Sequence, residues 1–184
     1  ITTNRVIVDP HTPARACFEW NIFTPHYKPL VLLSWRAEYQ FFGEAPAVFH
    51  FNNLLLHALN VLLVFFLSLQ LVLKIIPDKK QHHLLAGFFI ALAFAVHPLH
   101  VESVAWAVER KDVMYTFFFL LAWWAYLQYL EKTKLPWLLL SAGLYGLVIL
   151  TKSMGITLIA ILFLSDYLYS RKNIVGLIKE KIPH

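Results

Sequence analysis

The sequence predicts an all-α, polytopic membrane protein, a bundle of helices that crosses a bilayer several times. The 184-residue chain is 59% hydrophobic and only 15% charged, whereas ordinary soluble domains carry about 25% charged residues. Its charged residues are clustered between long apolar runs instead of being spread over a polar surface. Apolar runs of this kind suit a hydrocarbon core of about 30 Å, which a helix crosses at 1.5 Å per residue.

Residues 1–48 are expected to form an extracytoplasmic loop that carries a helix on the membrane surface. Apolar and aromatic residues recur at helical steps of four and three from 27 to 42, at Val31, Trp35, Tyr39 and Phe42. Arg36 and Glu38 lie off that face, as in helices that lie in the membrane interface. The alternative is a soluble amphipathic helix that packs on a neighbour.

Five apolar runs are predicted to span the membrane. Residues 45–73 contain no Asp, Glu, Lys or Arg, and the other runs follow at 84–96, 113–130, 135–151 and 154–170. We therefore expect three regions, which are the loop at 1–48, a transmembrane bundle at 49–172, and a basic amphipathic cytoplasmic tail at 173–184.

The charges of the connecting segments predict how the bundle is oriented. Alternation of five spans places the connections at 79–80, 131–134 and 171–172 on one side. These connections are short and net basic, so the positive-inside rule makes that side cytoplasmic. The extracytoplasmic side then receives residues 1–48, 97–112 and 152–153.

Polar residues recur on one face of the first span, at steps of three, four and three: His50, Asn53, His57 and Asn60. Polar groups within hydrocarbon are costly and are therefore candidates for function. They can equally serve to hydrogen-bond neighbouring helices. His50 lies near the extracytoplasmic end, where chemistry on an external substrate would take place.

The segment 97–112 is the densest polar cluster, and it contains His97, His100, Glu102, Arg110 and Asp112. Its cations suit phosphate oxygens, carboxylates can orient those cations, and His and Glu are plausible general bases. The alternative is a solvated loop whose surface ion pairs contribute little.

Lys152 lies on the same predicted side, where it either reaches the interface by snorkelling or holds a phosphate. Asp166 lies toward the cytoplasmic end and is expected to cap a helix or to pair with Arg171 or Lys172.

Other function classes receive less support from the sequence. Nine His residues are present, but no HExxH or Cys/His ligand spacing occurs, so we expect no metal ion. No G-x-G-x-x-G or Walker sequence occurs, so nucleotide hydrolysis is not indicated, and we expect no cofactor. The net charge of +5 comes from residues at the ends of apolar runs, which argues against a nucleic-acid partner. Cys17 is the single cysteine and cannot form an internal disulfide.

The strings FHFNNLLLH at 49–57 and HPLHVESVAW at 97–106, with ERKD at 109–112, resemble the membrane domain of transmembrane-and-tetratricopeptide-repeat proteins. That family is similar to the GT-C superfamily of glycosyltransferases, which includes protein O-mannosyltransferases. The resemblance covers residues 1–168, and the ERKD form is typical of bacterial members.

The resemblance implies a GT-C-like transferase that takes a sugar from a polyprenyl or dolichyl phosphate and glycosylates an acceptor outside the cytoplasm. The acceptor would be a protein hydroxyl or a glycan. By the same resemblance, three residues are candidates for catalysis: Glu102, His100 and Asp112. Four would bind the lipid phosphate or substrate: His50, His97, Arg110 and Lys152.

The resemblance also implies a fragment. The first span and the acidic pair that supplies the main base would lie upstream of Ile1, and the repeat domain would follow, so the chain alone is expected to be inactive. We expect a bacterial cytoplasmic membrane with the site facing the periplasm, and other membrane subunits as possible partners. Two other functions are compatible with the sequence: a non-catalytic assembly subunit with the same fold, and a transporter of lipid-linked sugars.

Overall fold

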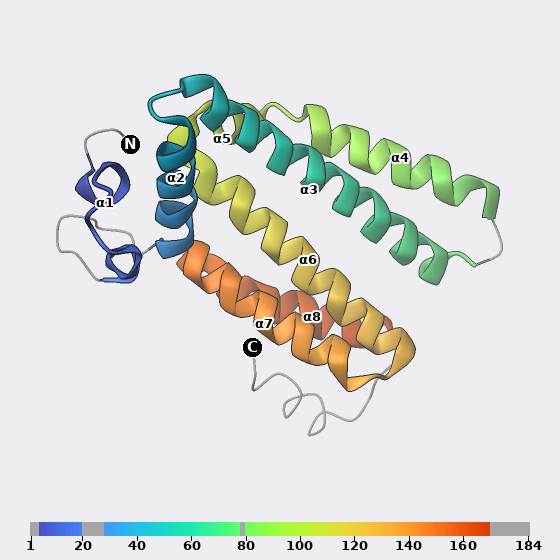
Figure 1. Ribbon diagram of the computed structural model, residues 1–184. Helices are drawn as coiled ribbons and strands as arrows, with labels where there is room; N and C mark the ends of the chain where they lie inside the picture. Colours follow the sequence, from blue (N-terminus) through green and yellow to red (C-terminus); the bar gives the residue numbers. More distant parts are fainter. Residues whose placement is uncertain (1–3, 20–27, 78–79, 170–184) are drawn as a thin grey trace.

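A computed structural model describes residues 4–19, 28–77 and 80–169, and all regular elements in these ranges are helical, which confirms the all-α class. Five long helices form the bundle (Figure 1): α3 (Pro46–Ile75), α4 (Lys80–Val96), α6 (Arg110–Lys132), α7 (Leu135–Thr151) and α8 (Thr157–Leu168). The other elements precede or connect them: α1 (Arg5–Val8), η1 (Ala14–Phe18), α2 (Pro29–Phe42), α5 (Leu99–Ala105), η2 (Ala107–Glu109) and η3 (Ser153–Ile156).

Two helical segments of the described chain are long and apolar enough to cross a membrane. They are α3 and the segment Ala107–Lys132, which contains α6. The pair α4 and α5 is bent by 62° and would count as a third span if both parts are taken together. Helices α7 and α8 are apolar but shorter. The predicted count of five spans is therefore not confirmed, and it stays a prediction.

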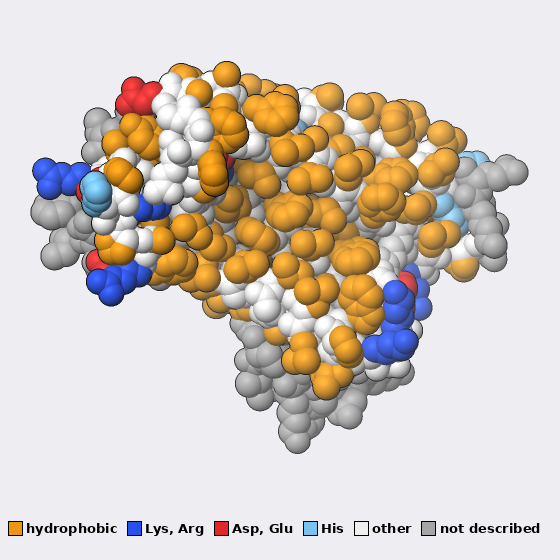
Figure 2. Space-filling view, viewed as in Figure 1, with side chains coloured by type: hydrophobic (Ala, Val, Ile, Leu, Met, Phe, Trp, Pro, Cys, Tyr) orange, Lys and Arg blue, Asp and Glu red, His pale blue; other side chains and the backbone are white. Residues whose placement is uncertain are grey.

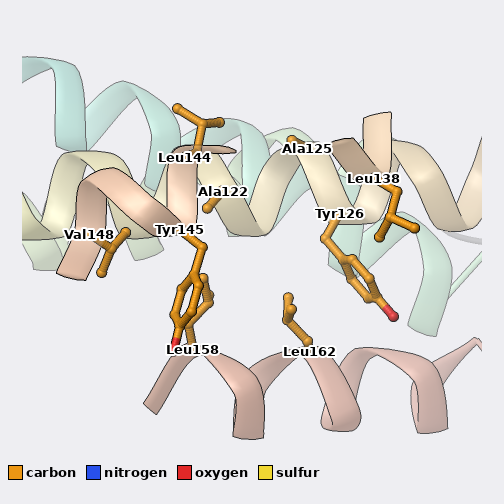
Figure 3. Packing of buried hydrophobic residues seen from close by; sticks show 9 residues of the cluster. All are labelled: Ala122, Ala125, Tyr126, Leu138, Leu144, Tyr145, Val148, Leu158 and Leu162. Carbon is orange, nitrogen blue, oxygen red and sulfur yellow. The ribbon is translucent and has the colours of Figure 1, made fainter. Parts of the chain in front are cut away.

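The largest packed core joins α6, α7 and α8. Figure 3 shows the side chains that meet between these helices: Ala122, Ala125, Tyr126, Leu138, Leu144, Tyr145, Val148, Leu158 and Leu162. Small side chains on α6 let α7 approach closely, and Ser141 Oγ donates a hydrogen bond to the Ala122 carbonyl at 3.0 Å. Gly155 lies where the chain turns back after α7, and a Cβ there would lie 2.9 Å from Val148 Cγ1, so a larger residue would require a shift.

The outer surface of the bundle is largely apolar. Figure 2 shows hydrophobic side chains over the middle of the visible face, whereas Lys, Arg, Asp and Glu gather at its two ends. Large apolar side chains such as Phe66, Leu84 and Leu164 are more than half exposed. Contiguous exposure of this kind marks a surface that contacts lipid.

Helix α2 matches the predicted amphipathic helix, but its polar face is also covered, by the segment that precedes it. Val31 and Trp35 are buried, as their spacing predicts, whereas Phe42 is 60% exposed. Arg36, which the sequence placed off the apolar face, is also buried. Its guanidinium donates to the carbonyl oxygens of Val6 and Thr12, so α1 and η1 pack against the polar side of α2. Location of α2 on a membrane surface stays a prediction.

Candidate functional site

Most of the predicted site segments lie at one end of the bundle. Helix α2, the start of α3, α5, the start of α6 and the end of α7 meet there (Figure 1). This end contains residues 28–49, 97–112 and 152, the segments that the charge pattern assigned to a single side. Antiparallel packing of successive helices brings them together. The side of the membrane on which this end lies stays a prediction.

Arg110 lies at the centre of this end and is 1% exposed. It is the first residue of α6, and its guanidinium points toward α2 and α3. Its Nη1 pairs with the Glu38 carboxylate and lies 3.4 Å from Ser34 Oγ. Nε donates to Asn53 Oδ1 at 2.8 Å, and Nη2 donates to the Phe49 carbonyl at 2.9 Å. All three guanidinium nitrogens are thus used in binding α2 and α3 to α6.

The sequence did not single out Glu38 as a site residue. Its Oε1 accepts from Arg110 and from Asn52 Nδ2, the latter at 2.8 Å, while its Oε2 is buried without a hydrogen-bond partner among the described residues. One signal could have identified it. Glu38 follows Trp35 by three residues and Val31 by seven, which places it next to the buried face of α2.

Lys152 and Asp112 form the most accessible ion pair at this end. Lys152 Nζ lies 2.6 Å from Asp112 Oδ1, and both side chains are 30% exposed. Asp112 lies in the first turn of α6, where a carboxylate is favoured by the helix dipole. Lys152 follows the last residue of α7 and also lies 5.9 Å from the Tyr115 ring centroid. The pair therefore links the start of α6 to the end of α7.

Two further lysines lie close to one another near α2. Lys28 lies 5.5 Å from the Trp35 ring centroid, and Lys111 forms an ion pair with Glu109 at 2.6 Å. Partial burial is the main cause that lowers the pKa of the Lys28 ammonium, and the positive charge of Lys111 adds to it. Glu109 acts in the opposite direction. This end of the molecule thus holds two more cations that the sequence reasoning did not assign.

The string HPLH ends α4 and starts α5. Pro98 has no N–H to pair with the Phe94 carbonyl, and His100 Nδ1 takes that carbonyl instead at 2.7 Å. His57 Nε2 from α3 pairs with the next carbonyl, that of Ala95, at 3.1 Å. His97 Nδ1 accepts from the Leu99 amide at 3.3 Å. The three histidines therefore satisfy backbone groups that the bend leaves open.

The polar face of α3 is used mainly in helix packing. Asn53, His57 and Asn60 are buried, and Asn60 Nδ2 donates to the Val113 carbonyl of α6 at 2.9 Å. This agrees with the alternative that the stripe bonds neighbouring helices. His50 differs, because it is exposed and makes no side-chain hydrogen bond within the described ranges.

The remaining predicted residues are separate from these contacts. Glu102 is exposed and has no side-chain hydrogen bond or ion pair in the part of the chain that the structure describes. Asp166 is buried and accepts from Tyr126 Oη at 2.9 Å, and its predicted partners Arg171 and Lys172 lie outside the described residues. Within the described ranges, no group of three His, Cys, Asp or Glu side chains is placed to hold a metal ion.

Comparisons with known proteins identify relatives of this chain. It is 34% identical over 170 residues to the human protein O-mannosyl-transferase TMTC4, a match that covers 86% of this chain and 23% of that protein. It is 36% identical over 186 residues to the mouse protein O-mannosyl-transferase TMTC1, covering 89% of this chain and 19% of that protein. The Drosophila melanogaster protein O-mannosyl-transferase Tmtc1 is 32% identical over 142 residues, which cover 77% of this chain and 16% of that protein.

The chain spans about a fifth of the length of these curated relatives. No protein-family model matches it, and no solved structure matches it. The relatives named above are animal proteins, so a bacterial type and a bacterial membrane are not confirmed. The apolar helices and these relatives together identify the chain as an integral membrane protein that is homologous to part of the TMTC protein O-mannosyl-transferases.

Proposed function

We propose that this chain is part of a membrane glycosyltransferase that transfers a sugar from a polyprenyl or dolichyl phosphate to a protein hydroxyl outside the cytoplasm. The observation that carries the proposal is the similarity to protein O-mannosyl-transferases over 86% of the chain. The names of these relatives make mannose the first sugar to test.

The reaction requires a cation where the lipid phosphate departs. The acceptor oxygen attacks the anomeric carbon, the bond from that carbon to the phosphate oxygen breaks, and the electron pair stays on the phosphate. A base takes the proton of the acceptor hydroxyl. A fixed cation that stabilises the charge growing on the phosphate speeds such a step. The end of the bundle with Lys28, Lys111 and Lys152 offers this environment.

Lys152 is the cation we assign to the phosphate. Its side chain is 30% exposed, and its ammonium is held by one carboxylate, that of Asp112, which a phosphate oxygen can replace or join. Arg110 is a less accessible donor, because its three nitrogens already donate to groups of α2 and α3. We propose that Arg110 positions Glu38. The contact between Arg110 and the lipid phosphate stays a prediction. His50 and His97 are exposed and remain candidates for the donor.

Glu102, His100 and Asp112 remain the candidates for proton transfer. Glu102 is exposed and free of partners within the described residues, which suits a group that must accept a proton. His100 Nδ1 bonds the Phe94 carbonyl, which leaves Nε2 as the ring nitrogen for chemistry. Asp112 is paired with Lys152 and is better placed to orient that cation.

The experiment is a sugar-transfer assay on the intact protein, with dolichyl phosphate mannose as donor and an acceptor peptide that contains serine and threonine. We expect Lys152→Ala to lower transfer about a hundredfold, as for removal of a group that stabilises transition-state charge. Its thermal stability should be nearly unchanged, because a part-exposed ion pair contributes at most about 1 kcal/mol.

Lys134→Ala is the matched control, since this exposed lysine lies at the opposite end of the bundle. Equal transfer by Lys152→Ala and Lys134→Ala would contradict the assigned phosphate site. Absence of transfer by the wild-type protein, with normal folding, would favour the non-catalytic assembly subunit.

A further inference from the structure

An open pocket lies between α3 and α6, toward the end of the bundle away from the proposed site. Its volume is about 680 Å³, within the range of small-molecule sites. Leu63 and Phe66 of α3 and Leu121 and Trp124 of α6 form its apolar part. The pocket opens between two helix pairs, because α3 packs with α4 while α6 packs with α7 (Figure 1).

Polar groups lie at one end of this pocket. Gln70, Lys74 and Glu131 line it there. Gln70 Nε2 donates to Glu131 Oε1 at 2.8 Å, and Tyr169 Oη donates to the same oxygen at 3.0 Å. The first bond links α3 to α6, the second links the end of α8 to α6, and together they hold the Glu131 carboxylate in place. The pocket is therefore apolar along most of its length and polar at one end, which we call its mouth and which is formed by Gln70, Lys74 and Glu131.

Lys74 is the cation at that mouth. It is the first charged residue of α3, which carries none from Pro46 to Leu73, and it lies one residue before the end of the helix. This position corresponds to the depth of lipid headgroups. Lys74 is exposed and lies over the Tyr169 ring at 4.5 Å, and it has no carboxylate partner among the described residues.

The charge around the mouth is positive. Lys132 and Lys134 lie at the end of α6 and just after it. With Lys74 they make three cations at this end, against the carboxylates of Glu131 and the buried Asp166 among the described side chains. Figure 2 shows Lys and Arg side chains gathered at this end of the bundle. Basic pockets between membrane helices are suited to anionic lipid headgroups.

We propose that this pocket binds a phospholipid with an anionic headgroup. Its phosphodiester contacts Lys74, and one acyl chain lies along Leu63, Phe66 and Leu121. The exposed fractions agree with such an occupant, because Phe66 and Leu73 remain 53% and 41% exposed although both line the pocket. The site is separate from the proposed transfer chemistry and does not depend on it.

The test is native mass spectrometry of the intact protein in detergent, with phosphatidylglycerol or phosphatidylcholine of identical chains added. We expect Lys74→Gln to weaken phosphatidylglycerol binding about fivefold and to leave phosphatidylcholine binding unchanged. Lys134→Gln, which removes a cation from the same end but outside the pocket lining, should weaken phosphatidylglycerol binding by less than about twofold and leave phosphatidylcholine binding unchanged. Equal weakening by both variants would overturn the site, since it would show attraction to a basic surface only.

A second pair of variants tests the apolar part of the pocket. Leu73→Trp fills it, and we expect retention of both lipids to fall at least fivefold. Ile75→Trp is the matched control, because Ile75 is also exposed on α3 but does not line the pocket. Thermal unfolding of each variant shows that the fold is retained. Unchanged lipid retention by Leu73→Trp, or a stable dimer that excludes lipid, would overturn the proposal.

Discussion

Among individual residues, Arg110 shows why a charge can be buried at this end of the molecule. A buried cation is tolerated only when its hydrogen bonds are satisfied and an anion is nearby. Glu38 supplies the anion, while Asn53 and the Phe49 carbonyl supply further acceptors. Glu38 in turn is only 12% exposed, and Arg110 is its cationic partner.

We therefore predict that Arg110→Ala lowers the free energy of unfolding by about 3–5 kcal/mol, because it leaves Glu38 buried without a cation. Thermal unfolding in detergent, followed by size-exclusion chromatography, measures the loss. Lys111→Ala is the control, and we expect a change of at most about 1 kcal/mol, since its partner pair is partly exposed. A stability of Arg110→Ala equal to that of Lys111→Ala would show that the buried pair contributes nothing.

Among the elements, the junction between α4 and α5 is the best defined. Pro98 removes the amide that would continue α4, and His100 and His57 take the carbonyls that become free. The outcome is a bend of 62° that is held by side chains from two helices. The string HPLH, which is part of the family resemblance, thus has a structural role that its sequence pattern explains.

This explanation predicts a coupling between positions 98 and 100. His100→Ala should cost about 1–3 kcal/mol of stability, because the Phe94 carbonyl loses its partner. In a Pro98→Ala background the same change should cost less, because the amide of residue 98 can pair with that carbonyl. A double-mutant cycle of thermal or denaturant unfolding measures the difference. Identical costs in both backgrounds would mean that His100 does not compensate for Pro98.

For the molecule as a whole, the distribution of charge relates the fold to the membrane. An apolar surface separates two charged ends (Figure 2). One end contains the Arg110–Glu38 and Lys152–Asp112 ion pairs, and the other contains Lys74, Lys132 and Lys134. The positive-inside rule assigns the second end to the cytoplasm, which would place the proposed transfer site outside.

Accessibility labelling tests this orientation. Trp106 is 54% exposed at the proposed outer end, and Cys17 is buried, so Cys17→Ser provides a background without other thiols. In intact cells, we expect Trp106→Cys to react with a membrane-impermeant maleimide. Lys134→Cys should react only after the membrane is permeabilised. Reaction of the two variants in the opposite order would invert the orientation and remove the proposed site from the outer side.

Much of the fold could be predicted from the sequence, because its signals are local. The apolar runs predicted the helices at 45–73 and 113–130, and the stripe through Val31 and Trp35 predicted α2. The break at His97-Pro98 is also where α4 ends. The number of spans was harder to predict, because α7 and α8 are short and whether they cross the bilayer depends on how they pack.

The sequence by itself determined that the protein is surrounded by a membrane. A chain with so few charges is stable only where lipid covers its apolar middle and water contacts its charged ends. Only the tertiary structure decided which polar side chains are already bonded and which remain available. Arg36 donates to carbonyl oxygens 24 and 30 residues away, and Arg110 pairs with Glu38, 72 residues away, whereas Lys152 and Lys74 stay accessible. A hydrophobic pattern can be read from residues that are neighbours in the sequence. The partner of a hydrogen bond can lie far away in the sequence, so it is known only from the folded chain.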